Sequence, residues 1–182
     1  MAKLEGKVAL ITGAAVGLGE GIAEVYAKYG AKMCMVDLSP EVEKTADRLR
    51  KEYGADIITY VGNVADKAQM KEAAAKTAEK FGEINVCCCN AGVCRLAPFE
   101  EFTDEMRDFH IDVNIKGVWN TCQAVIPYML QQGGGNVPGH PSLNEEVLTH
   151  GLGKVKAVAL QKRLNVIAIA KVHIALLSDN KS

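Results

Sequence analysis

The 182-residue sequence has no long apolar run, little net charge and no spacing typical of a metal site. No stretch reaches the roughly 18 apolar residues that a membrane-spanning helix needs. The formal net charge is −1 at pH 7, which gives no reason to expect a nucleic acid or an acidic membrane as a partner. The N-terminal sequence "MAKLEGKVAL" also lacks the layout of a signal peptide. These absences predict a cytoplasmic protein that binds neither nucleic acid nor a membrane.

No metal is expected either, because the cysteines and histidines do not form the two spaced pairs that a metal site needs. Three of the six cysteines, Cys87 to Cys89, are consecutive in an apolar run, where neighbouring side chains of a strand point to opposite faces. We expect all six to be reduced and to act as small hydrophobes. Four histidines are predicted to be surface or packing residues: His110, His140, His150 and His173.

What is present is an ordinary globular composition, with 48% hydrophobic and 24% charged residues, in a chain long enough for one domain. Strand and helix signals alternate over the first two thirds. The predicted strands are "KVALIT", "KMCMVD", "DIITYVG" and "INVCCCNAG". They are apolar throughout, which favours a parallel sheet covered by helices on both faces. The order predicts an α/β, doubly wound, Rossmann-type domain.

The predicted helices carry recognisable start and stop signals. Ser39 with Pro40 opens the second helix, Asp66 caps a third helix that runs to Phe81, and Thr103 begins a long helical stretch to about residue 132. Pro127 predicts a kink in that stretch. The aromatic residues of this region are predicted to pack in the core or between helices rather than to line a substrate site: Phe99, Phe102, Phe109 and Trp119.

A glycine-rich turn, "ITGAAVGLGEG", follows the first strand and opens the first helix. Gly13 permits a tight turn, Gly17 lets the backbone approach a pyrophosphate, and Gly19 allows close packing of helix against strand. The free N–H groups at the helix start then face the phosphates. Such a turn is also compatible with a purely structural role, so it needs support from elsewhere in the sequence.

Asp37 gives that support, because it ends the second strand about 20 residues after the loop. A carboxylate there accepts hydrogen bonds from an adenosine ribose. It would repel a 2′-phosphate, and no Arg or Lys stands at positions 14, 15, 38 or 39 to attract one. The cofactor expected is therefore NAD rather than NADP. The alternative is that Asp37 only caps a turn.

Together these motifs resemble the short-chain dehydrogenase/reductase family. The resemblance covers about residues 4 to 136, in the family's order and spacing, and rests on Thr12-Gly13-x-x-x-Gly17-x-Gly19, Asp37, "GNV", "NAG" and "DVNIKG". It implies that residues 1–136 form a dinucleotide-binding region. It also implies that residues 137–182 are a remnant of the substrate-lid and C-terminal helices of the same domain.

The resemblance also implies a role for each matching residue. Leu18 and Gly19 are expected under the diphosphate, and Asn63 and Val64 beside the adenine, although the family usually has Asp at position 63. Three residues are expected to line the cofactor beyond the fourth strand: Asn90, Ala91 and Gly92. Asn114 corresponds to the family's active-site asparagine, where a helix kink holds a water in a proton relay.

The family's catalytic Ser and Tyr-x-x-x-Lys are not found in this chain. In the family the tyrosine exchanges a proton with the substrate oxygen, and the lysine favours its phenolate, since a free phenol has a pKa near 10. The residues four positions after the five tyrosines are Gly30, Met33, Ile57, Val64 and Gln132. The resemblance thus implies that the fifth strand, the catalytic helix and the sixth strand are absent between about residues 137 and 140, which would leave the fourth strand at a sheet edge.

Three explanations stay open: a partial record of a longer enzyme, a truncated or frame-altered product, or a cofactor-binding protein that has lost catalysis. The leading expectation is an NAD-dependent oxidoreductase that interconverts a secondary alcohol and a ketone, as a homo-oligomer of two or four copies if the full-length chain exists. One alternative is a catalytically dead dinucleotide sensor or interaction protein. Another is a different nucleotide-fold enzyme such as a methyltransferase, which the "NAG" motif disfavours.

Overall fold

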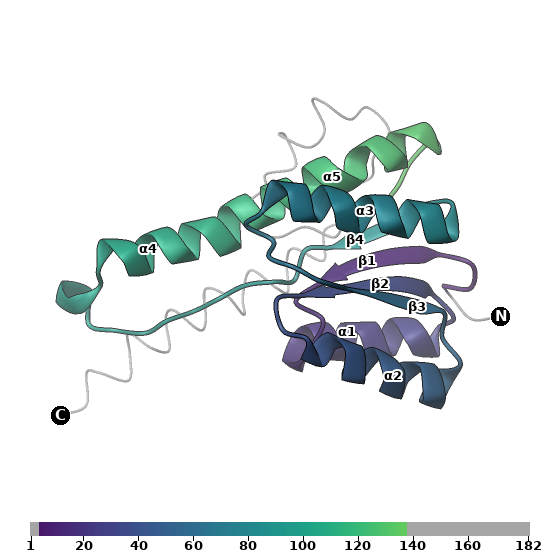
Figure 1. Ribbon diagram of the computed structural model, residues 1–182, viewed down its shortest axis with the longest axis horizontal. Helices are drawn as coiled ribbons and strands as arrows, with labels where there is room; N and C mark the ends of the chain where they lie inside the picture. Colours follow the sequence, from purple (N-terminus) through teal and green to yellow (C-terminus); the bar gives the residue numbers. More distant parts are fainter. Residues whose placement is uncertain (1–3, 138–182) are drawn as a thin grey trace.

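A four-stranded parallel sheet forms the centre of the molecule (Figure 1). The structure, a computed structural model, describes residues 4–137, and the expectations for residues 138–182 lie outside the described part. The strand order is β3-β2-β1-β4. The strands are β1 (Val8–Thr12), β2 (Lys32–Asp37), β3 (Ile57–Val61) and β4 (Val86–Cys88). The predicted doubly wound α/β sheet is confirmed.

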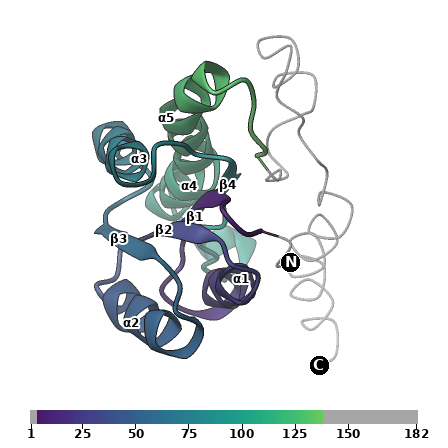
Figure 2. The same ribbon diagram turned by 90° about the vertical axis from the view of Figure 1, so that its right-hand side faces the viewer.

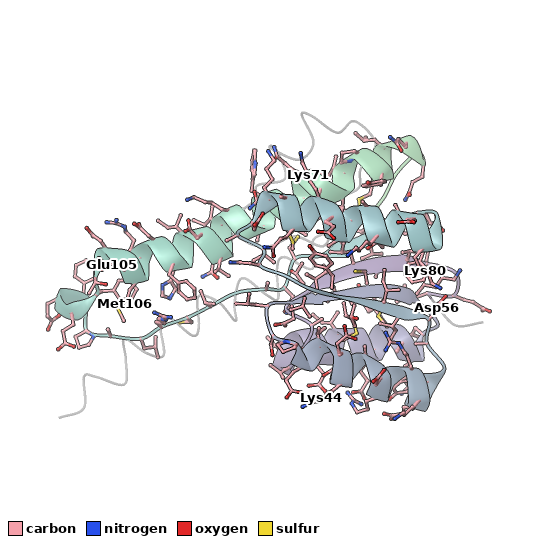
Figure 3. All side chains as sticks on the ribbon, in the orientation of Figure 1. Lys44, Asp56, Lys71, Lys80, Glu105 and Met106 are labelled. Atoms are coloured by element: carbon pink, nitrogen blue, oxygen red, sulfur yellow. The ribbon has the colours of Figure 1, made fainter. Side chains whose placement is uncertain are left out.

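Helices cover both faces of the sheet (Figure 2). Helices α1 (Gly17–Lys28) and α2 (Glu41–Tyr53) lie on one face, and α3 (Lys67–Phe81) and α5 (Gly117–Gln131) lie on the other. Lysines on their outer surfaces point away from the sheet, as Figure 3 shows for Lys44 on α2 and Lys71 on α3. Alternation along each strand divides the core in two: Leu10, Cys34 and Val36 face α3 and α5, whereas Ile11, Met33 and Met35 face the other pair.

Most helix boundaries follow the predicted signals. The Asp66 carboxylate accepts hydrogen bonds from the N–H groups of residues 68 and 69 at the start of α3, and Gly54 ends α2 in a left-handed conformation. Helix α2 begins at Glu41, one residue later than predicted, and its N-cap is Pro40 rather than Ser39. The Ser39 hydroxyl nevertheless accepts the N–H of Glu41 at 3.2 Å, so it still satisfies one of the free donors at the helix start.

The long helical stretch predicted after Thr103 is interrupted. Thr103 caps α4 (Asp104–Ile111) as predicted, but a π-helical segment, η2 (Asp112–Lys116), separates it from α5, which continues through Pro127. A short 3₁₀ turn, η1 (Phe99–Glu101), precedes α4. Figure 1 shows that η1 and α4 extend away from the sheet as an arm, on which Figure 3 labels Glu105 and Met106. No side chain of α4 is buried.

Two expectations for this part of the chain were wrong. Phe99 is not a packing residue, since it is 93% exposed on the arm, and Trp119 is 48% exposed on α5. The expected fourth strand is also shorter than "INVCCCNAG", because the chain leaves the sheet after Cys88. The next residues turn toward β1, where their amide groups bind the end of that strand.

The outer edge of β4 is partly covered. Asn136 forms an isolated parallel bridge with Val86: its N–H donates to the Asn85 carbonyl at 2.7 Å, and its carbonyl accepts from the Cys87 N–H at 2.9 Å. Val137 is buried beside this bridge. The expected open edge is therefore occupied at its first position.

Candidate functional site

The candidate site lies at the carboxyl edge of the sheet, between β1 and β4. The chain runs from β1 outward to β2 and β3 and then returns to β4 on the other side of β1, so the strand order reverses at this point. In open α/β sheets such a reversal is where ligands bind. The loops after β1, β2, β3 and β4 all meet this edge.

The Thr12 hydroxyl joins the turns that follow β1 and β4. It is 1% exposed and accepts the backbone N–H groups of both Asn90 and Ala91 at 3.1 Å. The Asn90 side chain returns two hydrogen bonds, donating from Nδ2 to the carbonyls of Thr12 at 3.2 Å and Gly13 at 3.0 Å. Four hydrogen bonds thus hold the two turns together, which makes the edge between the strands rigid.

Two glycines are required by this close approach. A side chain at Gly13, whose φ is +67°, would stand 2.7 Å from the Ala91 Cα. One at Gly19 would overlap the Gly13 carbonyl oxygen and lie 2.6 Å from Asn90 Nδ2. The roles predicted for both residues in turn and packing agree with this geometry.

Gly17 differs from the other two, because the space beside it is open. Its φ is +66°, and an added Cβ would meet no atom within 4 Å. It stands at the start of α1, where the cap residue is Val16 and, within residues 4–137, no side chain caps the first N–H groups. A hydrocarbon at the N-cap is unfavourable relative to Ser, Thr, Asp or Asn by about 0.5–2 kcal/mol. Free donors at a helix start with open space beside them match what an anion requires.

Leu18 is 60% exposed on the first turn of α1. It follows Gly17 directly, and its place beneath a diphosphate stays a prediction.

Asp37 contacts the glycine loop directly. Its Oδ2 accepts the N–H of Ala15 at 2.9 Å, and its Oδ1 accepts the N–H of Ser39 at 2.9 Å. The loop is also held from α2, where the buried Thr45 hydroxyl donates to the Ala15 carbonyl at 2.7 Å. The structure therefore supports the turn-capping alternative for Asp37 as a real interaction. Each carboxylate oxygen retains acceptor capacity, so capping and ribose binding are compatible.

The loop after β3 carries Asn63 and Val64 and is held by a hydrogen bond within its own turn and by contacts with α5. The Asn63 side chain accepts the N–H of Ala65 at 2.9 Å, and Val64 is buried against Gly117 at the start of α5. Asn120 on α5 donates from Nδ2 to the carbonyls of Val64 at 3.1 Å and Ala65 at 3.0 Å. Asn63 and Val64 thus lie at the same edge as the glycine loop, with α5 behind them.

Asn114 lies in the π-helical segment and binds the chain just beyond Gly92. Its Oδ1 accepts the Val93 N–H at 2.8 Å, and its Nδ2 donates to the Val93 carbonyl at 2.9 Å. A Cβ on Gly92 would approach Asn114 Oδ1 to 3.3 Å. Interruptions of this kind in helices are frequent at functional sites, and this one coincides with the residue predicted to be catalytic.

The structure brings the predicted site residues to one edge in three connected groups. Gly13, Gly19, Asn90 and Ala91 form the centre; Asp37 joins it through Ala15; Gly92 and Asn114 continue it toward the arm. Sequence reasoning included Thr12 in the family motif and treated His110 as a surface or packing residue, but it predicted no partner for either and gave Asn120 no role. Thr12 carried a signal, since a polar residue that ends an apolar strand must find a hydrogen-bond partner when buried.

The core that surrounds the site is apolar. Burial raises the pKa of the Cys34 and Cys88 thiols to about 11, and all six cysteines are free. Among the described residues, no three His, Cys, Asp or Glu side chains gather as a possible metal site. No helix in residues 4–137 has the length and apolar character needed to cross a membrane.

Comparison with known proteins adds an independent finding. The model of the short chain dehydrogenase family matches residues 7–140. Oxidoreductase UcpA of Escherichia coli strain K12 is 43% identical over 172 residues, which cover 91% of this chain and 65% of UcpA. The chain therefore spans about two thirds of the length of that relative.

Solved structures resemble the described fold. A short chain dehydrogenase from Mycobacterium paratuberculosis bound to NAD has a TM-score of 0.71 at 30% identity, over 74% of this chain and 55% of that one. L-sorbose reductase from Gluconobacter frateurii, complexed with NADPH and L-sorbose, has a TM-score of 0.71 at 26% identity, over 75% and 52% of the respective chains. These neighbours include both an NAD complex and an NADPH complex.

Proposed function

This chain belongs to the short-chain dehydrogenase family, and from that premise we propose that it provides the NAD-binding part of an oxidoreductase acting on a secondary alcohol or ketone. The observation that carries the proposal is the joining of the β1 and β4 turns through Thr12 and Asn90, next to an uncapped helix start. That arrangement leaves backbone donors for a diphosphate at the point where the strand order reverses.

Each half of the dinucleotide has candidate partners along this edge. Residues 17–19 would hold the diphosphate, Asp37 the adenosine ribose, and Asn63 with Val64 would flank the adenine. Residues 90–92 and Asn114 would line the nicotinamide side. When bound, the nicotinamide would supply or accept the hydride. The full-length protein is proposed to assemble as a homo-oligomer.

Asp37 provides the test of cofactor preference. We expect Asp37→Ala to weaken NADH binding by roughly tenfold or more, because a hydrogen bond to a charged group contributes about 1.5–3 kcal/mol. NADPH binding should weaken much less, because removing the Asp37 carboxylate also removes its repulsion of the 2′-phosphate. The variant also frees the Ala15 N–H, which affects both cofactors, so the deciding quantity is the ratio of the two dissociation constants measured by fluorescence titration.

The matched control is Asp47→Ala, which removes an exposed carboxylate on α2 whose partner in the described part of the chain is Arg50. It should leave both dissociation constants unchanged. Equal losses for NADH and NADPH in Asp37→Ala would refute the role assigned to Asp37.

A catalytically inactive dinucleotide-binding protein is the second candidate. It is favoured by the lack of a lysine four residues after any tyrosine in the 182 residues. Turnover of a panel of ketones with NADH separates the two candidates, provided that the intact mass of the sample is measured alongside. A sample with the mass of 182 residues that binds NADH and turns over no carbonyl compound would favour the inactive protein.

A further inference from the structure

His110, which no motif of the family assigns, binds the chain that leaves the site after Gly92. Its Nε2 lies 2.8 Å from the Arg95 backbone N, and its Nδ1 lies 2.6 Å from the Met106 carbonyl oxygen. A backbone carbonyl only accepts, so Nδ1 carries the proton and Nε2 is the acceptor for the Arg95 N–H. Both ring nitrogens of a neutral histidine are thereby used.

His110 and Asn114 act on the same extended segment. They are four residues apart on the helical arm, a rise of about 6 Å, and they bind residues 95 and 93, which are two apart in extended chain, a rise of about 6.6 Å. The two spacings match. The side chains of His110 and Asn114 therefore form hydrogen bonds with the backbone of this segment, as a neighbouring strand would. Asn114 pairs with both backbone groups of Val93 and His110 adds the contact with Arg95.

The His110 ring is itself held in place. Its centroid lies 5.4 Å from that of Phe102 and 6.1 Å from that of Phe109. The Arg95 guanidinium covers the Phe109 ring at 4.4 Å from its centroid. The segment is thus attached to the arm through its backbone and through a side chain, although α4 buries none of its own residues.

The position of residues 93–95 indicates a function for their attachment to the arm. With the diphosphate at the start of α1 and the adenosine beside Asp37, the nicotinamide half falls on the β4 side, where residues 93–95 follow the Asn90–Gly92 turn. We propose that His110 is a positioning residue that holds the Val93–Arg95 segment as the wall of the nicotinamide side of the site. This inference rests on the proposed function, because it assumes that a dinucleotide binds across the edge.

Three variants of His110 test the proposal. His110→Ala removes both hydrogen bonds, His110→Asn can reach only the Met106 carbonyl, and His110→Gln places a carbonyl where Nε2 accepts the Arg95 N–H. The measurements are the amide exchange rate of Arg95 by NMR and the dissociation constants of NADH and ADP-ribose, which lacks nicotinamide. All three are made on the full chain.

A hydrogen bond contributes about 1 kcal/mol, or roughly fivefold. We therefore expect His110→Ala and His110→Asn to speed Arg95 exchange and weaken NADH binding about fivefold. His110→Gln should stay near wild type in both measurements, and ADP-ribose binding should be unchanged in all three variants.

Two outcomes overturn the inference while wild-type NADH binding is intact. One is a His110→Gln variant that behaves as His110→Ala does in Arg95 exchange. The other is an equal loss of NADH and ADP-ribose affinity in His110→Ala. If the wild-type chain binds neither nucleotide, the proposed function fails and this inference fails with it, so the two failures are distinguishable.

Discussion

Gly19 and Gly21 are two glycines of the same helix with opposite surroundings. A Cβ on Gly19 would overlap the Gly13 carbonyl oxygen and crowd Asn90, whereas one on Gly21 would meet nothing within 4 Å. Gly19 is therefore required for close packing in the site, whereas Gly21 only lowers the stability of the helix.

We expect Gly19→Ala to destabilise the fold by about 1–3 kcal/mol, because inserting an atom into a packed contact forces the backbone to shift. NADH binding should be lost with it, since the turns after β1 and β4 would separate. Gly21→Ala should instead stabilise α1 by about 0.5–1 kcal/mol and leave binding unchanged. Denaturant unfolding and NADH titration check both; a Gly19→Ala variant as stable as the wild type contradicts the packing role.

The residue scale is also where the sequence predicted best. Glycines and an acidic residue at fixed spacing were sufficient to locate Gly13, Gly19 and Asp37, because each position has a backbone or charge requirement that few residue types satisfy. The partners of Thr12, Asn120 and His110 were not predicted, because most of them are backbone groups of segments that are remote in the sequence. A polar side chain does not reveal in the sequence which remote carbonyl or N–H it will bind.

At the scale of elements, Arg48 links the two helices on one face of the sheet. It donates hydrogen bonds from α2 to Glu20 and Glu24 of α1, both at 3.0 Å, and to Glu52 at 3.1 Å. The pKa of the Glu24 carboxyl is lowered from 4.5, mainly by the hydrogen bond from Arg48 and next by the hydrogen bond from Tyr53. The contribution of a carboxylate with a lowered pKa is present above its unfolded pKa and is lost as pH falls through the folded value.

The predicted consequence is a stability difference that depends on pH. Arg48→Gln should lower the free energy of unfolding at pH 7 modestly, since these are largely exposed charges, and the difference from wild type should shrink as the pH falls below about 4.5, the unfolded pKa. Denaturant unfolding at several pH values measures it. Lys44→Gln, which breaks an exposed contact within α2, is the control without a link between helices. A difference that grows on acidification would contradict the assignment.

Element boundaries were less predictable than element order. The pattern after Thr103 favours one continuous helix, and only the resemblance implied a kink at Asn114. The structure has a π-helical segment there, where Asn114 binds Val93 and Gly117 packs on Val64. Similarly, β4 ends at Cys88 because the Asn90 and Ala91 N–H groups bind Thr12 rather than a sheet neighbour. Both departures come from contacts between segments far apart in the sequence.

The bridge between Asn136 and Val86 occupies the first position that a fifth strand beside β4 would have. A ladder continuing in the same register needs an N–H from residue 138 for the Cys87 carbonyl, two residues beyond the pair already formed. Residue 138 is proline, which has no N–H. The sequence itself therefore removes the donor that would extend this bridge, a constraint that is invisible until the register is known.

For the whole molecule, the described surface is divided unevenly. The sheet and its four helices bury two apolar clusters. Large apolar side chains are exposed around the glycine loop, such as Val16, Leu18 and Leu38, and also from residue 96 through α5. Among the described residues these include Leu96, Phe99, Ile115, Trp119 and Leu130. Exposed apolar residues scattered singly are normal, but neighbouring ones such as Leu96 and Phe99 are typical of a surface that associates.

We therefore predict that the 182-residue chain self-associates as its concentration rises, and that the arm and the chain just before it take part. The double variant Leu96→Ser and Phe99→Ser should reduce association. These two side chains are 72% and 93% exposed, so the apolar contacts that the change removes are those made with another copy of the chain. Their exposure also means that the unfolding free energy should change by no more than about 0.5 kcal/mol. Val25→Ser on α1, also exposed and apolar, is the control away from the arm. Sedimentation velocity over a concentration series measures association; an unchanged profile in the double variant, or an equal reduction in the Val25 control, would contradict the role of the arm.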